Sequence, residues 1–291
     1  MAPAEPFFKR ISIIGLGLIG GSWALALKRL GYPAPRIGYD RPEVLRRALS
    51  AGAVDGAGED LPSAVRDADL VILATPVGAI LDLLDHLKPH VSPQALVTDV
   101  GSTKRVICRR AIEALGDGPL FLGGHPLAGK ENSGFERADP AIFENVCYAL
   151  TPPSPELMGD ARVRAFVGLV ESLGARPYVT DASSHDLAVA YLSHVPQLLS
   201  SGLASLIADE ITDQNLPLEL AGSGFRDLTR LAESPYGLWR DICLTNIENI
   251  QAGLEALIEK LEGIKSHLSD RELEKIFVQA RTLRDRLREQ K

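Results

Sequence analysis

The sequence predicts an α/β fold in which a doubly wound parallel sheet is followed by an all-α domain. Over residues 1–180, short apolar stretches typical of buried strands alternate with stretches of helical spacing. That alternation is typical of a parallel sheet with crossover helices. From residue 181 to residue 291 no strand pattern recurs, and long apolar helical stretches take its place. We therefore predict a domain boundary between residues 180 and 181.

A glycine-rich turn joins the first predicted strand, residues 11–14, to the first predicted helix. The turn reads Gly-Leu-Gly-Leu-Ile-Gly, and each glycine has a task in a dinucleotide site. Gly15 makes the sharp turn, Gly17 lets a pyrophosphate approach the backbone, and Gly20 lets the helix pack on the strand. The unpaired N–H groups at the start of the helix attract phosphate. We predict a Rossmann-type site that holds its cofactor through Gly15, Gly17, Leu18, Ile19 and Gly20.

Asp40 favours NAD over NADP. It ends the second predicted strand, residues 36–40, twenty residues after Gly20. There a carboxylate accepts the ribose hydroxyls of the adenosine half and repels a 2′-phosphate. Arg41 weakens this preference, because an arginine can pair with such a phosphate. NAD is the predicted cofactor; a glycine turn that only packs a helix on a sheet is the alternative.

Further strands and helices follow in alternation. Strands are predicted over 54–55, 69–74, 95–100, 120–124, 146–151 and 176–180, and helices over 42–51, 77–87, 105–114 and 163–173. Thr75, Ser102 and His125 each come directly after a strand, at the edge where parallel sheets bind ligands. Thr75 and Ser102, with Asp40 and Arg41, complete the predicted cofactor contacts. The alternative for each is an ordinary polar turn residue.

The all-α domain opens on a long apolar segment. Residues 184–210 are apolar on several sides, which is typical of a buried helix, and Pro196 must kink or split that helix. Apolar residues then recur at spacings of three and four from Ile247 to Leu268, as in a heptad seam. We expect a homodimer through this dimerisation domain, because its apolar surface exceeds what one small domain covers. A self-contained bundle is the alternative.

Composition excludes several classes of partner. The chain has 291 residues, 45% of them hydrophobic and 24% charged, as in an ordinary globular protein. A net charge of −7 argues against nucleic acid, and no apolar run reaches the length of a membrane span. The three cysteines form no C-x-x-C pair, so neither a metal site nor a disulfide framework is indicated. A reducing cytoplasm fits, and no signal peptide is recognisable.

Two histidines and two arginines are the candidates for chemistry. His125 stands among small residues that suit a positioned catalytic base; an exposed loop histidine is the alternative. His194 lies beside the Pro196 kink, which frees a backbone carbonyl that needs a hydrogen-bond partner. The alternative is therefore a structural core histidine that serves as this partner. Arg226 and Arg230 follow a glycine-rich turn and project from one helix face, which indicates an anionic substrate. Surface ion pairs are the alternative there.

Five motifs together resemble the prephenate/arogenate dehydrogenase family of tyrosine biosynthesis. They are Gly-Leu-Gly-Leu-Ile-Gly-Gly-Ser at 15–22, Asp-Val-Gly-Ser-Thr-Lys at 99–104, Gly-His-Pro-Leu-Ala-Gly at 124–129, Ser-His-Val-Pro-Gln at 193–197 and Gly-Phe-Arg-Asp-Leu-Thr-Arg at 224–230. The resemblance covers about residues 10–265. It implies NAD-dependent oxidative decarboxylation of prephenate, arogenate or both to 4-hydroxyphenylpyruvate or tyrosine. Hydride leaves C4 of the cyclohexadienol, and the ring carboxylate departs as carbon dioxide.

The resemblance also implies a role for each candidate. His125 accepts the proton of the C4 hydroxyl, and Ser102 shares that hydroxyl beside the nicotinamide. His194 lines the substrate pocket, and Arg230 holds the substrate carboxylate. Arg226 contacts the substrate side chain or the rim of the pocket. Glu131 controls access to the pocket.

Two rival classes remain. A 3-hydroxyacid dehydrogenase, or another Rossmann-plus-helical enzyme, is disfavoured because the helix after Asp181 offers His185 and His194 and no lysine. A non-catalytic NAD-binding protein is disfavoured by His125 and the arginine pair.

Overall fold

The computed structural model describes residues 6–129, 134–214 and 216–289. It divides into two compact units, residues 1–247 and 248–291, which we describe separately. The predicted boundary between residues 180 and 181 lies inside the first unit. There α7 (Ala182–Val189) packs against α5 (Arg105–Leu115), and α10 (Tyr236–Thr245) packs against α4 (Val77–Leu87). That boundary stays a prediction.

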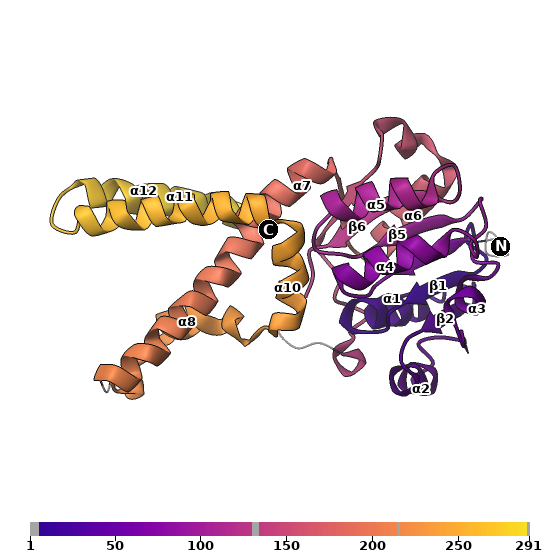
Figure 1. Ribbon diagram of the computed structural model, residues 1–291, viewed down its shortest axis with the longest axis horizontal. Coiled ribbons are helices and arrows are strands. Elements are labelled where there is room, and N and C mark those ends of the chain that lie inside the picture. Colours follow the sequence, from indigo (N-terminus) through magenta and orange to yellow (C-terminus); the bar gives the residue numbers. More distant parts are fainter. Residues whose placement is uncertain (1–5, 130–133, 215, 290–291) are drawn as a thin grey trace. The chain divides into compact units, whose positions relative to one another are not determined.

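Within the described residues, an eight-stranded sheet forms the centre of the first unit (Figure 1). Its order is β3-β2-β1-β4-β5-β6-β7-β8, and β1 to β6 are parallel. The strands are β1 (Ile11–Ile14), β2 (Arg36–Tyr39), β3 (Gly56–Ala57), β4 (Leu70–Leu73), β5 (Leu96–Asp99), β6 (Leu120–Pro126), β7 (Cys147–Thr151) and β8 (Arg176–Val179). The predicted doubly wound sheet is confirmed, and the third strand begins two residues later than expected.

The last two strands depart from the expected all-parallel arrangement. β7 pairs antiparallel with β6, and β8 is parallel to β7. The described part of the connection between β6 and β7 contains only a short 3₁₀ turn, η1 (Phe135–Arg137). Since a parallel pair needs a longer crossover, usually a helix, the chain returns here alongside the strand it has just left.

Helices cover both faces of the sheet, and each face has its own apolar core. One core joins strand residues to α1 (Leu18–Arg29), α2 (Pro42–Ser50) and α6 (Ala161–Ser172), with Trp23 packed on Phe166 and Phe143. The other joins them to α3 (Leu61–Val65), α4 (Val77–Leu87) and α5 (Arg105–Leu115). The central strands β1 and β4 are fully buried, as expected of parallel strands covered on both faces.

The helical part of the first unit begins with α7 (Ala182–Val189), a π-turn over Ala190–His194 and α8 (Val195–Gln214). Pro196 has no N–H to donate to the preceding turn, and the helix changes to π geometry directly before it. The expected kink or split thus takes the form of a π-turn that interrupts the α-helical geometry, and Pro196 itself lies in the first turn of α8. After α8 the chain continues through η4 (Leu218–Leu220), α9 (Ser223–Thr229), η5 (Arg230–Glu233) and α10 (Tyr236–Thr245). One further 3₁₀ turn, η2 (Pro155–Gly159), lies earlier in the chain, between β7 and α6.

The second unit consists of α11 (Ile247–Ser266), which starts at the unit boundary, and α12 (Glu272–Glu289). The heptad positions Ile247, Leu261 and Leu268 are 48%, 47% and 68% exposed. The expected burial of the 184–210 helix is also incomplete, since Leu192 is 81% exposed. Among the described residues, we find no helix with the length and apolar character that crossing a membrane requires.

Candidate active site

The glycine turn has the geometry that its sequence predicts. Gly15 has φ of +92°, and a Cβ there would lie 2.6 Å from the carbonyl oxygen of Ala74. A Cβ on Gly20 would collide with the Gly15 carbonyl and lie 2.9 Å from the Ala74 Cβ. Around Gly17, in contrast, the described residues leave open space within 4 Å. Gly17 is the N-cap of α1, and no described side chain caps that helix. Its N–H groups therefore face a space that suits a phosphate.

Asp40 and Thr75 border the same turn. The Asp40 carboxylate accepts hydrogen bonds from the backbone N–H of Leu16 and of Arg41, both at 2.6 Å. Arg41 itself is an exposed side chain with its Nε 3.9 Å from Asp40. Thr75 Oγ1 is buried and has no hydrogen-bond partner among the described residues. An orphaned hydroxyl beside an open helix N-terminus fits a polar cofactor, and Leu18 and Ile19 form the half-buried first turn of that helix.

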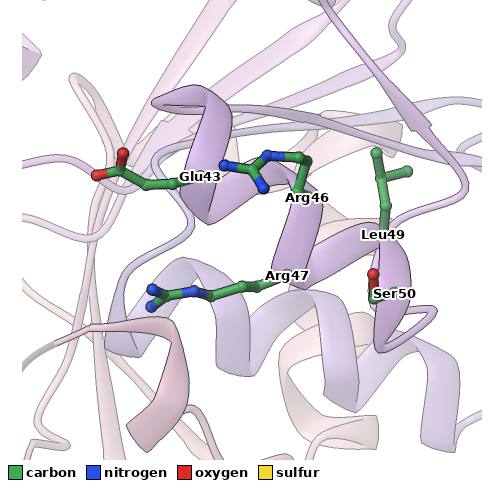
Figure 2. A pocket seen from close by; sticks show the side chains of 5 residues that line it. All are labelled: Glu43, Arg46, Arg47, Leu49 and Ser50. Carbon is green, nitrogen blue, oxygen red and sulfur yellow. The ribbon is translucent and has the colours of Figure 1, made fainter.

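A surface hollow of about 680 Å³ lies on α2, shortly after Asp40 in the chain. It is lined by Glu43, Arg46, Arg47, Leu49 and Ser50, whose side chains project from this one helix (Figure 2). Arg47 also pairs with Glu136 of η1. In the described structure its lining includes none of the predicted site residues, although Glu43 lies 3.8 Å from the side chain of Arg41.

A buried ion pair braces the loop that carries Ser102. Lys104 and Asp99 are both fully buried and bonded to each other. Asp99 also accepts from the N–H of Gly101 at 2.8 Å and of Gly124 at 3.1 Å, while Lys104 Nζ donates to the Gly124 carbonyl at 2.7 Å. Ser102 lies half-buried between the two partners. The pair therefore holds the Ser102 loop against the strand that carries His125.

His125 lies within β6 and not in a loop, which corrects our expectation. Parallel pairing with β5 ends at Leu122, but antiparallel pairing with β7 continues to His125 and Pro126. Close packing makes both preceding glycines necessary: a Cβ on Gly124 would lie 2.6 Å from the Asp99 carbonyl oxygen, and one on Gly123 would lie 2.8 Å from Cys108 Sγ. The histidine is therefore fixed by a sheet ladder on one side and projects beyond the end of β5.

Two residues of α7, His185 and Asp186, connect His125 to the interior through hydrogen-bond contacts. His125 Nδ1 lies 2.9 Å from His185 Nε2, and His185 Nδ1 lies 2.8 Å from Asp186 Oδ1. The Asp186 carboxylate accepts from the backbone N–H of Lys104 at 2.7 Å and of Arg105 at 2.9 Å. It thereby caps the N-terminus of α5, where a negative charge is favoured.

His194 is buried at the end of the π-turn. Its ring lies edge-on to Trp239 of α10, with centroids 5.8 Å apart, and its Nδ1 is 3.3 Å from Asn246 Nδ2. Asn246 also donates to the Asp186 carbonyl at 2.8 Å. The structure thus brings His194 and His125 into one network through Asp186.

Burial determines the protonation of both histidines. Desolvation, and then the neighbouring His185, Lys104 and His194, hold the pKa of His125 well below the usual range for histidine. Desolvation lowers the pKa of His194 to about 4 against the opposing effect of Asp186. Both rings are therefore neutral at pH 7, and a neutral imidazole is the form that acts as a base.

The two arginines lie on α9 and the turn that follows. Arg226 is exposed, and its Nε donates to the Ala221 carbonyl at 3.3 Å. Arg230 is the C-cap residue of α9 and keeps helical dihedral angles. Its turn is held by Gln197 of α8, whose Nε2 donates to the Leu231 carbonyl at 2.7 Å. Arg230 is therefore tied to the helix that begins directly after His194. Glu131 lies outside the described residues.

Four residues of this network were not among the predicted site residues: His185, Asp186, Trp239 and Asn246. They are spread over α7, α10 and the residue after α10, so no local motif joins all four. The adjacent His185 and Asp186 in the sequence Ala-Ser-Ser-His-Asp-Leu-Ala-Val were the one available signal, because two neighbouring titratable residues require partners when they are buried.

Family models match most of the chain. The model described as the nucleotide-binding domain of prephenate dehydrogenase matches residues 23–179, and the model of the dimerization domain of prephenate dehydrogenase matches residues 181–282.

Individual relatives agree with the family models. A prephenate dehydrogenase of Lactococcus lactis subsp. cremoris is 37% identical over 264 residues, which cover 90% of this chain and 70% of the relative. The crystal structure of Synechocystis arogenate dehydrogenase is similar with 34% identity and a TM-score of 0.79, covering 96% of this chain and 99% of that one. The structure of prephenate dehydrogenase from Aquifex aeolicus in complex with hydroxyphenyl propionate and NAD⁺ has 28% identity and a TM-score of 0.84, covering 99% of this chain and 100% of that one.

Proposed function

Since the chain belongs to the prephenate dehydrogenase family, we propose that it catalyses the NAD-dependent oxidative decarboxylation of prephenate, arogenate or both. The products are 4-hydroxyphenylpyruvate and tyrosine, respectively. One observation carries the proposal: a neutral histidine, His125, is fixed at the carboxyl edge of the sheet and tied through Lys104 to the Ser102 loop. The open N-terminus of α1 lies at the carboxyl end of β1 in the same sheet.

His125 acts as the general base. As the C4–H bond breaks, the hydroxyl proton of the cyclohexadienol passes to a ring nitrogen of His125, and C4 becomes a carbonyl carbon. The carbon–carbon bond to the ring carboxylate then breaks, carbon dioxide leaves, and the electron pair of that bond shifts through the ring to the C4 oxygen. The ring becomes aromatic as a phenolate, which takes back the proton from His125 to give the phenol. Bound NAD supplies the hydride acceptor. Ser102 donates to or accepts from the same hydroxyl and so orients it.

The remaining candidates bind the substrate and the cofactor. Arg230 pairs with a substrate carboxylate, because a guanidinium matches a carboxylate in geometry and charge. Arg226 contacts the substrate side chain or the rim of the pocket, His194 lines the pocket, and Glu131 controls access. Asp40 holds the adenosine ribose. Gly15, Gly17, Leu18, Ile19, Gly20, Arg41 and Thr75 complete the cofactor site.

The chain acts as a homodimer through residues 181–291, with residues 1–180 as the dinucleotide-binding domain. Support comes from the dimerization-domain model and from exposed apolar side chains, among them Leu192, Leu220 and Phe277 at 81%, 82% and 68%. Sedimentation equilibrium tests the dimer, and a monomer at all concentrations would contradict it. We place the protein in the cytoplasm, in keeping with its three free cysteines.

A single assay separates the proposed function from its rivals. NADH formation is measured with prephenate, with arogenate and with a panel of 3-hydroxy acids, and the product is identified by mass. We expect turnover with prephenate or arogenate and with equimolar release of carbon dioxide. Turnover of a 3-hydroxy acid alone would contradict the proposal, as would NAD binding without turnover of any substrate.

A further inference from the structure

His125, His185 and Asp186 form a chain of hydrogen bonds whose direction can be worked out. Asp186 lies at its inner end, fully buried, where its two oxygens accept from the backbone N–H of Lys104 and Arg105. A carboxylate is an acceptor only. The contact of 2.8 Å between Asp186 Oδ1 and His185 Nδ1 therefore requires the proton on His185 Nδ1.

The same reasoning identifies the donor in the contact between His185 and His125. A neutral His185 with its proton on Nδ1 has an unprotonated Nε2, which can only accept. The contact of 2.9 Å with His125 Nδ1 therefore requires His125 to donate from Nδ1. In a neutral His125 this leaves the lone pair on Nε2, the ring nitrogen that lies away from His185.

We infer that His185 and Asp186 are positioning residues that hold His125 in the tautomer whose Nε2 is unprotonated and directed to the substrate. The inference rests on the proposed role of His125 as the base. A base needs its lone pair at the atom that meets the proton, and the other tautomer would present an N–H to the substrate hydroxyl. Once Nε2 has taken the proton, the Nδ1–H bond to His185 stays in place, and the Asp186 carboxylate stabilises the cation through His185.

The anchoring of Asp186 explains why the direction is fixed at that end. Two backbone N–H groups of α5 cannot change from donors to acceptors, whereas a side-chain donor could rotate away. Asn246 Nδ2 also donates to the Asp186 carbonyl, which fixes the backbone of the same residue. Asp186 is thus the common acceptor, which receives the backbone N–H groups of α5 on one side and, on the other, the donor series that runs from His125 through His185.

A second aspartate offers a matched control, because it caps a helix as Asp186 does but has no contact with a histidine among its described side-chain bonds. Asp241 of α10 caps α4 as Asp186 caps α5: its Oδ2 accepts from the N–H of Gly78 at 2.9 Å. Its described side-chain bonds go to Gly78 and Arg240, not to a histidine. Asp241→Asn therefore removes charge from a helix cap without touching the tautomer of His125.

The first test reads the tautomer directly. In ¹⁵N-labelled protein with NAD bound, two-bond ¹H–¹⁵N spectra distinguish which ring nitrogen of His125 carries the proton. We expect the proton on Nδ1 in the wild type and in Asp241→Asn, and a shift toward the Nε2–H form in Asp186→Asn, whose amide can donate to His185. The same tautomer in all three proteins would overturn the inference. This measurement needs no turnover, so it holds even if the substrate is not prephenate or arogenate.

The second test uses turnover and guards against misfolding of the Asp186 variant. His185→Gln offers an oxygen that can accept from His125 Nδ1, whereas His185→Leu cannot. Both variants are compared with the wild type for cooperative thermal unfolding before assay. We expect kcat to fall roughly 100-fold in Asp186→Asn and His185→Leu, with partial rescue in His185→Gln and a change within about threefold in Asp241→Asn. Equal losses in the two His185 variants, or in the two aspartate variants, would show a structural role only. An inactive wild type would refute the proposed function instead.

Discussion

Lys104 Nζ donates a hydrogen bond of 2.7 Å to the carbonyl oxygen of Gly124, the residue directly before His125. The same ammonium is paired with Asp99, and both side chains are fully buried. Because Ser102 lies between these two residues, the pair couples the Ser102 loop to β6. A buried ion pair is weak evidence of net stability, since desolvation opposes the attraction. We interpret this one as fixing the relative position of Ser102 and His125.

Lys104→Met should destabilise the fold, because it leaves the Asp99 carboxylate buried without its cation. We expect the free energy of unfolding in urea to fall by about 3–5 kcal/mol. Lys275→Met, which breaks an exposed pair with Glu272 on α12, should cost less than about 1 kcal/mol. Similar losses in the two variants would show that Asp99 does not depend on Lys104.

Gly17→Ala and Gly20→Ala should separate cofactor binding from folding. A Cβ at Gly17 meets open space among the described residues, whereas one at Gly20 meets the Gly15 carbonyl. We expect Gly17→Ala to keep its melting temperature and to raise the Kd for NAD, because the methyl group occupies the space for the pyrophosphate. Gly20→Ala should lower the melting temperature. Unchanged NAD affinity in Gly17→Ala, measured by calorimetric titration, would refute the predicted path of the phosphates.

Arg230→Ala should raise the KM for the substrate with little change in the affinity for NAD. A charge-assisted pair contributes roughly 1.5–3 kcal/mol, which corresponds to about a 10- to 150-fold change. Arg226→Ala is the matched comparison, and because Arg226 is bonded to its own turn we expect a smaller rise. Steady-state kinetics with saturating NAD give both values. A larger effect at Arg226 would reverse the two assignments.

Acid should destabilise the protein through His194. Its pKa is about 4 in the fold, below the usual 6.5, so between these values the unfolded chain binds more protons. Stability is therefore complete above pH 6.5, falls as the pH drops toward 4 and levels off below it. The expected loss is roughly 3 kcal/mol, and the lowered pKa of His125 adds a loss of the same sign. In urea unfolding at a series of pH values, His194→Asn should show a shallower decline, and an unchanged slope would refute this cause.

Local features of the site could be predicted from the sequence. The roles of Gly15 and Gly20 follow from backbone sterics within one turn, and the structure gives them the close approaches that those roles need. The split before Pro196 likewise follows from a missing N–H group. In each case a few neighbouring residues determine the outcome.

Contacts between distant elements could not be predicted. His125 and His185 are 60 residues apart, and their approach depends on how α7 packs against the sheet. The extension of β6 through His125 depends on the antiparallel return of β7. The connection between these two strands has no periodic pattern in the sequence, so the direction of β7 relative to β6 could not be predicted. The cap that Asp186 forms on α5 depends on both arrangements together.

The kinetics of His125→Asn test the role of His125 most directly. Asparagine keeps a polar side chain of similar reach but cannot take a proton at neutral pH, and the glycine turn that binds NAD is elsewhere in the sheet. With prephenate or arogenate as substrate, we expect kcat to fall by about 100- to 10,000-fold while the Kd for NAD stays close to that of the wild type. An unchanged kcat would contradict the assignment of His125 as the base.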